Sequence, residues 1–455
     1  MSAIARVLLK MGYRVSGSDL NLTGITTRLE KMGAVVYQGH RPENIEGAGL
    51  LVVSSAVPKE NPEVLAARKC GITVIRRGEM LARLMEARKG IAVAGTHGKT
   101  TTTSMISLVL EKAGLDPTVL IGGELNDFGG NAKLGKGGYL VAEADESDGS
   151  FLELRPQIAV VTNAEADHLD YYHSLERVTQ AFSTFINMVP DDGLAVICTD
   201  DPFLRSYRTW TAKKVITYAL TSGADYGAVD LEFEGFGSSC TLVHQGKEIG
   251  RLKLLVPGKH NIQNALAAVA VGRYLGIDHE VILSALESFG GVQRRFQALG
   301  ITSGVWVVDD YAHHPTEVAA TLEAARQVAG GRIICIFQPH RYTRTKALYR
   351  EFGLALARAD HLFITEIYPA GEAPIPGVTS ALIVRSAAEA GRKPRHSKDP
   401  EEIIQEVLAL AAPGDLVLSM GAGDVYKIGL ELLRRLRYKD PEKKDQSTGR
   451  EAVTG

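Results

Sequence analysis

The segment from residue 89 to residue 103 constrains the fold of this chain more than any other. It reads K-G-I-A-V-A-G-T-H-G-K-T-T-T-T, an apolar run followed by a glycine-rich turn and the start of a helix. In that order, backbone N–H groups at the helix start face one point, where the helix dipole adds about +0.5 charge. The segment therefore predicts a phosphate-binding loop, in which Lys99 reaches the β- and γ-phosphates and the Thr100 hydroxyl binds Mg²⁺.

The loop departs from the usual pattern G-x-x-x-x-G-K-[ST] at one position. That pattern places its first glycine at residue 93, where this chain has Val93, and the first glycine here is Gly95. The alternative interpretation is an ordinary glycine-rich turn with a solvated lysine. The strand before the turn and the helix after it favour the phosphate loop, since phosphate binding requires both.

Segments on both sides of the loop alternate between strand-like and helix-like patterns. This alternation predicts an α/β fold with doubly wound, mainly parallel sheets. Short alternating runs between residues 229 and 256 predict an antiparallel insert. The expected strands are 13–19, 34–37, 49–54, 138–144, 158–162, 194–198, 305–309, 332–337, 361–367 and 415–420, and the expected helices include 2–11, 175–189 and 261–275.

Length and composition limit the class of protein. The 455 residues correspond to three domains at ~150 residues each. The 51 Lys and Arg residues and the 53 Asp and Glu residues give a net charge of −2, which argues against nucleic acid as a partner. No apolar run reaches the ~18 residues that cross a bilayer, the N-terminus lacks a secretory signal pattern, and the four cysteines form no C-x-x-C pair. We expect a cytoplasmic enzyme that has no membrane partner and is a monomer or a weak dimer.

Polar side chains near the ends of strands are candidate metal ligands. Glu143 ends the apolar run Y-L-V-A-E, level with the phosphate loop, and a carboxylate there is suited to Mg²⁺. Glu146 and Asp148 follow closely and are alternatives to Glu143 as the ligand. A purely structural carboxylate is the other interpretation of Glu143. His168 is a lone histidine in a predicted loop, and its sequence position alone is as typical of a structural histidine as of a metal ligand.

Two pairs of polar residues have a spacing of three. Asn261 and Asn264 lie one helical turn apart, so both amides face the same side of the helix start and suit the edge of an adenine ring. Helix capping by Asn261 is the alternative. Arg341 and Arg344 can grip a carboxylate and a phosphate, and because positive charge is unfavourable at a helix start, a bound anion is favoured there. A solvated basic helix start is the alternative.

The loop resembles the ATP loop of the Mur ligases, the ATP-dependent amide-forming enzymes of peptidoglycan precursor synthesis. Motifs similar to those of this family occur along the chain from residue 1 to about residue 437. They are E-A-D-E-S-D-G-S-F-L (143–152), T-N-A-E-A-D-H-L-D (162–170), P-G-K-H-N-I-Q-N (257–264), R-R-F (294–296), D-D-Y-A-H-H-P-T-E (309–317), Q-P-H-R-Y-T-R-T (338–345) and Y-P-A-G-E-A-P-I-P-G (368–377).

The resemblance implies a three-domain Mur ligase architecture. Residues 1–86 would form a UDP-sugar-binding domain, residues 87–297 a central P-loop ATP-binding domain and residues 298–437 a C-terminal ligase domain. Both outer domains would resemble dinucleotide-binding folds. A polar stretch at 438–455 is expected to be a disordered tail.

The resemblance also implies roles for individual residues. The catalytic residues would be Lys99, Glu143, His168 and Arg295. The ATP-binding residues would be Gly95, Thr96, His97, Gly98, Lys99, Thr100, Thr101, Asn261, Asn264, Arg295 and Asp310. Two Mg²⁺ ions would be held by Thr100, Glu143 and His168. The substrates would be bound by Ser18, Asp19, Ser54, Ser55, His340, Arg341 and Arg344.

Within the family, the motifs are most similar to those of the member that joins L-alanine to UDP-N-acetylmuramate. In that reaction the γ-phosphoryl group of ATP moves to the lactyl carboxylate, and the amine of L-alanine then displaces phosphate. The runner-up is a related member that adds a tripeptide to the same UDP-sugar, and H-R-Y-T-R-T (340–345) disfavours it. Folylpolyglutamate synthetase shares the loop type but lacks D-Y-A-H-H-P (310–315) and a segment like residues 1–86 of this chain. A nucleotide-dependent binding protein without ligase activity is disfavoured by Lys99, Glu143 and His168.

The start of the chain differs from the family pattern. In the family, a strand and a G-x-G-G-x-G-M turn precede the helix that residues 2–11 resemble. We therefore expect that this sequence lacks the first strand and the loop for the UDP diphosphate. Residues 1–85 should then be less stable than the rest of the chain, and they should bind the UDP-sugar weakly.

Overall fold

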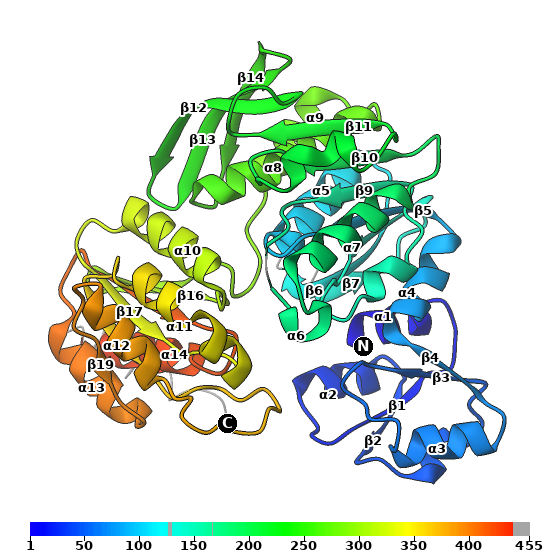
Figure 1. The fold of residues 1–455 in the computed structure, drawn as a ribbon, viewed down its shortest axis with the longest axis horizontal. Coiled ribbons are helices and arrows are strands. Elements are labelled where there is room, and N and C mark those ends of the chain that lie inside the picture. Colours follow the sequence, from blue (N-terminus) through cyan, green and yellow to red (C-terminus); the bar gives the residue numbers. More distant parts are fainter. Residues whose placement is uncertain (126–129, 166, 440–455) are drawn as a thin grey trace, which may run out of the picture. The chain divides into compact units, whose positions relative to one another are not determined.

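The strand and the helix predicted on either side of the glycine-rich turn are both present in the computed structural model (Figure 1). They are β5 (Lys89–Ala94) and α5 (Lys99–Lys112). The structure describes residues 1–125, 130–165 and 167–439. By their contacts these residues divide into a first unit (1–231, 239–254 and 261–290) and a second unit (232–238, 255–260 and from 291 onward).

Strand β5 lies inside a ten-stranded sheet with the order β14-β13-β12-β11-β10-β9-β5-β8-β6-β7. Its parallel neighbours are β9 (Ile158–Val161) and β8 (Tyr139–Glu143), and every residue of β9 is buried. Strands buried on both faces read as continuous apolar runs, which is why they are recognisable in the sequence. Four other strands of this sheet are β6 (Thr118–Leu125), β7 (Gly130–Lys133), β10 (Leu194–Cys198) and β11 (Val215–Ala219).

The antiparallel insert predicted between residues 229 and 256 forms one end of the same sheet. Strands β12 (Tyr226–Glu234), β13 (Gly237–His244) and β14 (Lys247–Leu254) are neighbours in this order, and two-residue connections join them. A connection this short permits only antiparallel pairing. Buried residues alternate with more exposed ones along β13, so this part of the sheet has one buried face.

Helices α5 and α7 (Leu175–Asn187) pack against strands of this sheet (Figure 1). Helix α5 is buried from Thr100 to Leu110, and α8 (Lys259–Tyr274) is buried over most of its length because its sequence is rich in Ala and Val. The remaining helical segments of this region are η2 (Ser150–Glu153), α6 (Leu169–Tyr172), η3 (Leu204–Thr209) and α9 (His279–Glu287).

The N-terminal region of the first unit contains two separate pairs of parallel strands. Strand β1 (Ser16–Asp19) pairs with β2 (Val35–Gln38), and β3 (Leu50–Val53) pairs with β4 (Thr73–Arg76). No residue of β1, β2 or β3 is buried, although doubly wound sheets normally cover both faces of their strands. The helical segments around them are α1 (Ser2–Lys10), α2 (Gly24–Lys31), η1 (Pro42–Ile45), α3 (Pro62–Lys69) and α4 (Arg77–Glu86).

The second unit contains a six-stranded sheet with the order β15-β16-β20-β17-β18-β19, in which only the β15–β16 pair is antiparallel. In β17, Ile333, Cys335 and Phe337 belong to one hydrophobic cluster, whereas Ile334 and Ile336 belong to another. Because successive side chains point to opposite faces, the sheet is covered on both sides. The strands are β15 (Gln297–Thr302), β16 (Val305–Asp310), β17 (Ile333–Phe337), β18 (His361–Ile364), β19 (Arg395–His396) and β20 (Leu416–Met420). The helices are α10 (Pro315–Val328), α11 (Tyr342–Leu356), α12 (Ala381–Glu389), α13 (Pro400–Leu410) and α14 (Tyr426–Lys439).

Several elements of the structure differ from the predictions in their bounds or their order. Strand β16 ends at Asp310, one residue beyond the predicted strand 305–309, and because β15 precedes it, β16 is the second strand of its sheet in chain order. Strand β18 ends at Ile364 rather than at residue 367. Helix α14 continues to Lys439, so the first two residues of the predicted tail are helical, and residues 440–455 lie outside the described part of the chain.

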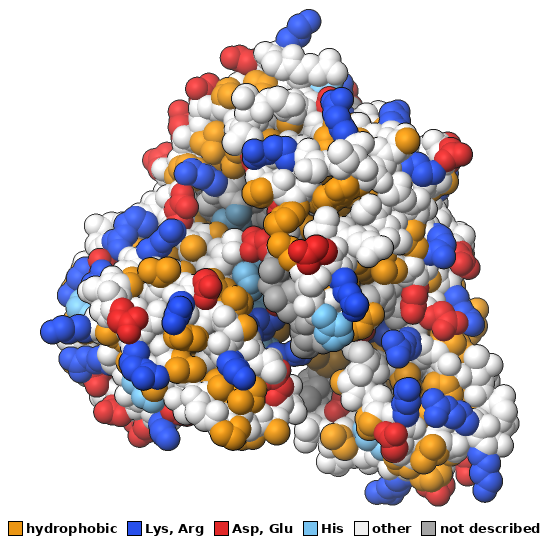
Figure 2. Space-filling view, in the orientation of Figure 1, with side chains coloured by type: hydrophobic (Ala, Val, Ile, Leu, Met, Phe, Trp, Pro, Cys, Tyr) orange, Lys and Arg blue, Asp and Glu red, His pale blue; other side chains and the backbone are white. Residues whose placement is uncertain are grey.

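Acidic and basic side chains are interspersed over the face shown in Figure 2. This mixture agrees with the nearly balanced net charge of −2. Among the described residues, no helix combines the length and the apolar character that crossing a membrane requires.

Candidate active site

The residues of the predicted phosphate loop connect β5 to α5. Gly98 is the N-cap of α5 with φ of 81°, and Gly95 has φ of 140°. Side chains other than hydrogen are disfavoured at both angles. A Cβ on Gly95 would lie 2.0 Å from Thr162 Oγ1, and a Cβ on Gly98 would lie 2.7 Å from Asn264 Oδ1. Backbone conformation and close packing therefore both require glycine at these two positions.

Residues that follow β9 hold the loop from the side. His97 N donates to Asn163 Oδ1 at 2.7 Å, and Asn163 Nδ2 donates to His97 O at 3.0 Å. Thr162 Oγ1 also donates to His97 O at 2.6 Å, and Glu165 N donates to Thr96 Oγ1 at 2.9 Å. The sequence did not predict these hydrogen bonds, because the segment that begins T-N-A-E is recognisable there only as part of the family motif at 162–170. The one available signal was its position at the end of the predicted strand 158–162.

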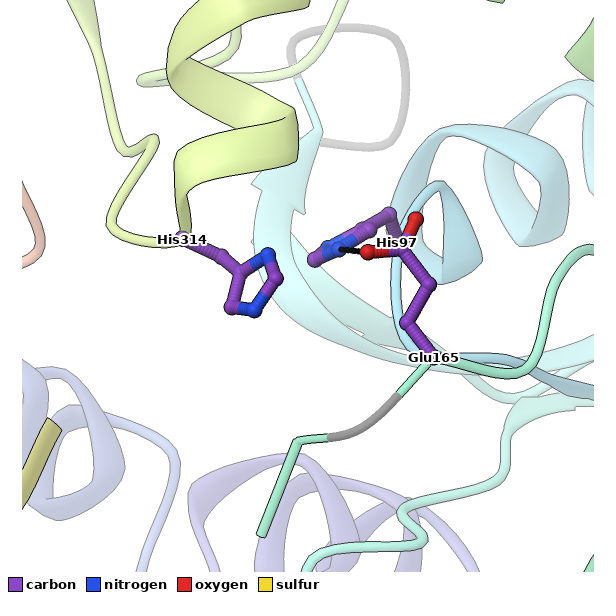
Figure 3. Close-up of side chains that lie close together, drawn as sticks. All are labelled: His97, Glu165 and His314. Atoms are coloured by element: carbon purple, nitrogen blue, oxygen red, sulfur yellow. Dashed lines mark ion pairs between the residues drawn. The ribbon is translucent and has the colours of Figure 1, made fainter. Parts of the chain in front are cut away.

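The side chain of His97 has a carboxylate close to it. His97 Nε2 lies 3.5 Å from Glu165 Oε2, the ion pair drawn as a dashed line in Figure 3. Both residues belong to the first unit. His314, which Figure 3 also labels, precedes α10 of the second unit and is buried.

Lys99 is bonded to three protein oxygen atoms. Its Nζ donates to Gly95 O at 2.5 Å, to Thr96 O at 3.1 Å and to Glu146 Oε1 at 2.8 Å. Burial lowers the pKa of Lys99, but the carboxylates of Glu146 and Glu143 outweigh burial and raise it overall. Burial raises the pKa of Glu146 to about 7, against the opposing charge of Lys99. The phosphate-loop lysine is therefore a charged group inside a cluster of carboxylates.

Glu143 stands at the end of β8 and faces the start of α5. Thr100 Oγ1 lies 3.1 Å from both carboxylate oxygens of Glu143, and Gly122 N donates to Oε2 at 2.8 Å. Thr101 follows in the first turn of α5 and is buried. A hydroxyl and a carboxylate beside a phosphate loop supply the hard oxygen ligands that Mg²⁺ prefers. The residues present therefore fit a Mg²⁺ ion.

His168 lies beside Glu146. Its Nε2 is 3.7 Å from Glu146 Oε1 and 3.6 Å from Asp167 Oδ2. Its φ of 54° is uncommon for a residue other than glycine. Of the predicted metal ligands, the structure brings Thr100 and Glu143 into direct contact and places His168 next to Glu146.

Asn261 and Asn264 are the third and sixth residues of α8, and both are buried. Asn264 Nδ2 lies 3.5 Å from Asn261 Oδ1, which confirms that the two amides face the same side. Because α8 begins two residues earlier, Asn261 is not its cap, and that alternative is wrong. Thr102 Oγ1 donates to Asn264 Oδ1 at 3.1 Å, so Asn264 also braces helix α5.

The residues predicted for the UDP-sugar lie at the carboxyl ends of β1 and β3. Ser18 and Asp19 are the last residues of β1, and Ser54 and Ser55 follow β3. Ligands of doubly wound sheets bind at this edge. The hydroxyl of Ser18 already donates to the buried carboxylate of Glu63 at 2.7 Å.

Arg295 and Asp310 belong to the second unit. Asp310 accepts hydrogen bonds from Phe296 N at 2.7 Å and Ala312 N at 2.6 Å. Burial raises the pKa of Asp310 to about 6, which the charge of Arg295 offsets only in part. Arg295 Nη1 lies 3.6 Å from Glu317 Oε1. Asp310 thus fixes the segment that leads into β15, a role that the sequence did not indicate.

His340, Arg341 and Arg344 gather at the start of α11. Arg341 is the N-cap residue with φ of 69°, and the buried Arg344 has its Nη1 3.4 Å from His340 Nδ1. Burial, together with the charges of the two arginines, lowers the pKa of His340 to about 4. The ring of His340 stacks on Tyr368 with the ring centres 5.8 Å apart, and His313 lies edge-on at 5.7 Å. A neutral histidine and two guanidinium groups at a helix start form a site suited to an anion.

A phosphate loop with an adjacent hydroxyl–carboxylate pair, and an anion site on another α/β unit, define an enzyme that uses a nucleoside triphosphate. Three family models match the chain: the catalytic domain of the Mur ligase family at residues 1–89, the Mur ligase middle domain at 93–272, and the glutamate ligase domain of Mur ligases at 294–423. The chain belongs to the Mur ligase family, and the predicted three-domain architecture is confirmed.

Curated relatives agree closely with this assignment. The UDP-N-acetylmuramate–L-alanine ligase of Pelotomaculum thermopropionicum is 52% identical over 96% of this chain and 95% of its own. The enzyme of the same name from Desulforamulus reducens is 52% identical over 96% of each chain. Among solved structures, the UDP-N-acetylmuramate–alanine ligase of Thermotoga maritima has a TM-score of 0.83 at 31% identity and covers 97% of both chains. A murein peptide ligase from Psychrobacter arcticus has a TM-score of 0.70 at 25% identity over 96% of both chains.

Proposed function

We propose that this chain ligates L-alanine to UDP-N-acetylmuramate with ATP, forming UDP-N-acetylmuramoyl-L-alanine, ADP and phosphate for peptidoglycan synthesis. The observation that carries this proposal is the 52% identity, over nearly the full length, with relatives named for this reaction. The phosphate loop supports it, because the loop has the glycines, the lysine and the braced conformation that triphosphate binding needs.

In the first step the lactyl carboxylate must become a better electrophile. A carboxylate oxygen attacks the γ-phosphorus of ATP, the bond from the γ-phosphorus to the β-phosphate oxygen breaks, and ADP and an acyl phosphate form. Phosphoryl transfer depends on positioning and on charge neutralisation more than on covalent help from the protein. Lys99 and the N–H groups at the start of α5 supply both.

We assign two Mg²⁺ ions to this step, with Thr100, Glu143 and His168 as protein ligands. When bound, the ions neutralise charge on the phosphate oxygens. Both carboxylate oxygens of Glu143 lie 3.1 Å from the hydroxyl oxygen of Thr100. This contact supports the assignment, because it places several oxygen atoms directly beside the loop.

In the second step the neutral amine of L-alanine attacks the acyl carbon. The tetrahedral intermediate then expels phosphate, and the proton that the nitrogen loses is taken up by the released phosphate, which leaves an amide and hydrogen phosphate. We assign Arg341, Arg344 and His340 to the carboxylate of L-alanine or to the UDP-sugar. The contact of the Arg344 guanidinium with the imidazole of His340, and the charge of Arg341 that also acts on this ring, support this role, because the site then carries net positive charge.

The remaining residues implied by the resemblance complete the proposal. Asn261, Asn264, Arg295 and Asp310 would contact ATP, and residues at the ends of β1 and β3 would contact the UDP-sugar. We also propose that the enzyme works in the cytoplasm as a monomer or a weak dimer.

The test is phosphate release from ATP by the purified chain. Release should require UDP-N-acetylmuramate and L-alanine together, and neither alone should support it. Release that needs neither substrate would identify an ATPase. Release supported by the tripeptide L-alanyl-γ-D-glutamyl-meso-diaminopimelate in place of L-alanine would identify the murein peptide ligase activity instead.

A further inference from the structure

The hydrogen-bonding capacity of Lys99 is fully used by the protein. A lysine ammonium has three N–H donors, and Nζ meets Gly95 O, Thr96 O and Glu146 Oε1. Two of these partners are neutral carbonyls of the phosphate loop itself. Only Glu146 carries a charge and comes from another element. Phosphate oxygens that bind Lys99 must therefore compete above all with Glu146.

Glu146 is held in place and has few other partners. Its residue is 3% exposed, and its Oε2 is buried without a hydrogen-bond partner among the described residues. Tyr172 Oη donates to the backbone oxygen of Glu146 at 2.6 Å, and Gly149 N donates to the same oxygen at 3.0 Å. These contacts fix the backbone of Glu146, and the burial of the residue keeps its carboxylate away from water.

Glu146 is distinct from the candidate metal ligand Glu143, three residues earlier. The carboxylate of Glu143 is engaged by Thr100 and Gly122. The carboxylate of Glu146 is engaged by Lys99 at 2.8 Å, and His168 Nε2 lies farther from it, at 3.7 Å. The two acidic residues of the motif E-A-D-E therefore serve different groups of the same loop.

We propose that Glu146 is a positioning residue that competes with nucleotide phosphates for Lys99 and thereby sets the affinity of the enzyme for nucleotide. This inference rests on the proposed function in one respect, namely that the loop binds ATP. Breaking the buried pair leaves a carboxylate without its cation, which opposes nucleotide binding. The Glu146 carboxylate thus keeps nucleotide affinity below what the loop alone would give.

The test is calorimetric titration of ADP, without divalent metal, into the full chain and into two variants. In E146Q the neutral amide competes less well for Lys99, and since a charged partner is exchanged for a neutral one, binding should tighten roughly tenfold. D145N is the matched control. Asp145 is the neighbouring residue and its charge acts on Lys99, but its carboxylate bonds Arg77 Nη2 at 2.8 Å and Ser147 N at 3.1 Å. D145N should change affinity much less than E146Q.

A double-mutant cycle separates this contact from a general loss of negative charge. In a K99A background, E146Q should leave ADP affinity unchanged, because the Lys99 ammonium for which residue 146 competes is absent. In steady state, E146Q should lower the KM for ATP with little change in kcat.

Two results would overturn the proposal: ADP binding to E146Q that is no tighter than to the parent, or the same gain in the K99A background. If E146Q melts at a lower temperature than the parent, E146D is measured as well. It keeps the charge but withdraws the oxygens by one methylene, so it should also tighten binding. A parent chain that bound no ADP at all would instead contradict the proposed function.

Discussion

At the scale of single residues, the site residues that could be predicted are those that lie close together in the sequence. The glycines, Lys99 and Thr100 of the phosphate loop lie within six residues, so their local pattern was sufficient. The bracing by Asn163 joins residues 66 positions apart in the chain, and no local pattern contains that information. For the same reason the sequence could not distinguish the contacts of Glu143 from those of Glu146.

Lys99→Ala should abolish ligation. The developing charge on the transferred phosphoryl group loses its main protein cation, and removal of one such group lowers the rate by ~10²–10³-fold or more. Alanine-dependent phosphate release measures the effect. Lys112→Ala, at the exposed end of the same helix, is the control and should be near normal. Near-normal activity of Lys99→Ala would show that the phosphate-loop assignment is wrong.

Arg341→Ala should raise the KM for L-alanine or for the UDP-sugar, and Arg344→Ala should act in the same direction. Loss of a charge-assisted hydrogen bond to a substrate anion corresponds to a roughly 10–100-fold increase, with little change in the KM for ATP. Steady-state kinetics with each substrate varied in turn provide the measurement. Lys346→Ala, an exposed cation on the same helix, should leave all three KM values unchanged. A selective effect on ATP would contradict the assignment, and equal effects on all three would indicate a folding defect.

Asp310 should make stability depend on pH. Burial raises its pKa to about 6 in the folded chain, so the protonated carboxyl is favoured by folding. Its stabilising contribution is present below the unfolded pKa of about 4 and is lost as pH rises through about 6. The free energy of unfolding of the parent minus that of Asp310→Asn should therefore decrease as the pH is raised from about 4.5 to about 7.5, a range that covers most of the interval between the two pKa values. Urea unfolding followed by tryptophan fluorescence, to which Trp306 on the same strand contributes, measures it. A difference that stayed constant or grew would refute the buried, raised-pKa carboxyl.

At the scale of elements, the strands that are buried along their whole length, β9, β10, β17 and β20, were predicted within one residue, whereas β4, β6 and β11 were not predicted. Strand β10 has the predicted bounds, 194–198, because all five of its residues are buried and apolar. Strand β1 was expected from residue 13 but begins at Ser16, and its sequence Ser-Gly-Ser-Asp carries no apolar signal. Apolar runs create the pattern that sequence analysis uses, and a strand without one, such as β1, is found only approximately.

The exposure of β1, β2 and β3 predicts weak local stability. Backbone amides of these strands should exchange with deuterium at least ~10²-fold faster than those of β5, β8 and β9, because few buried contacts protect them. Hydrogen exchange of the full chain, read by mass spectrometry of its peptides, gives the comparison within one sample. Equal protection in the two groups of strands would contradict the expectation that residues 1–85 are the least stable part of the chain.

At the scale of the whole molecule, the family and its three-domain architecture follow from motifs that occur in all three predicted domains. The motifs were sufficient because most of them lie at the carboxyl end of a strand or at the start of a helix, whereas R-R-F (294–296) directly precedes β15. The boundaries at residues 86/87 and 297/298 stay predictions. The segment around the second boundary shows why sequence alone could not place it: Phe296 is tied to Asp310 by a hydrogen bond of 2.7 Å, a contact invisible in the sequence.

The central claim is that the chain forms an amide through an acyl phosphate. The most direct test uses UDP-N-acetylmuramate labelled with ¹⁸O in its lactyl carboxylate, incubated with ATP, L-alanine and the purified chain. Mass spectrometry should find UDP-N-acetylmuramoyl-L-alanine and inorganic phosphate that carries one ¹⁸O atom for each amide formed. Phosphate without ¹⁸O beside the same amide would contradict the acyl phosphate, and phosphate without any amide would contradict the ligase itself.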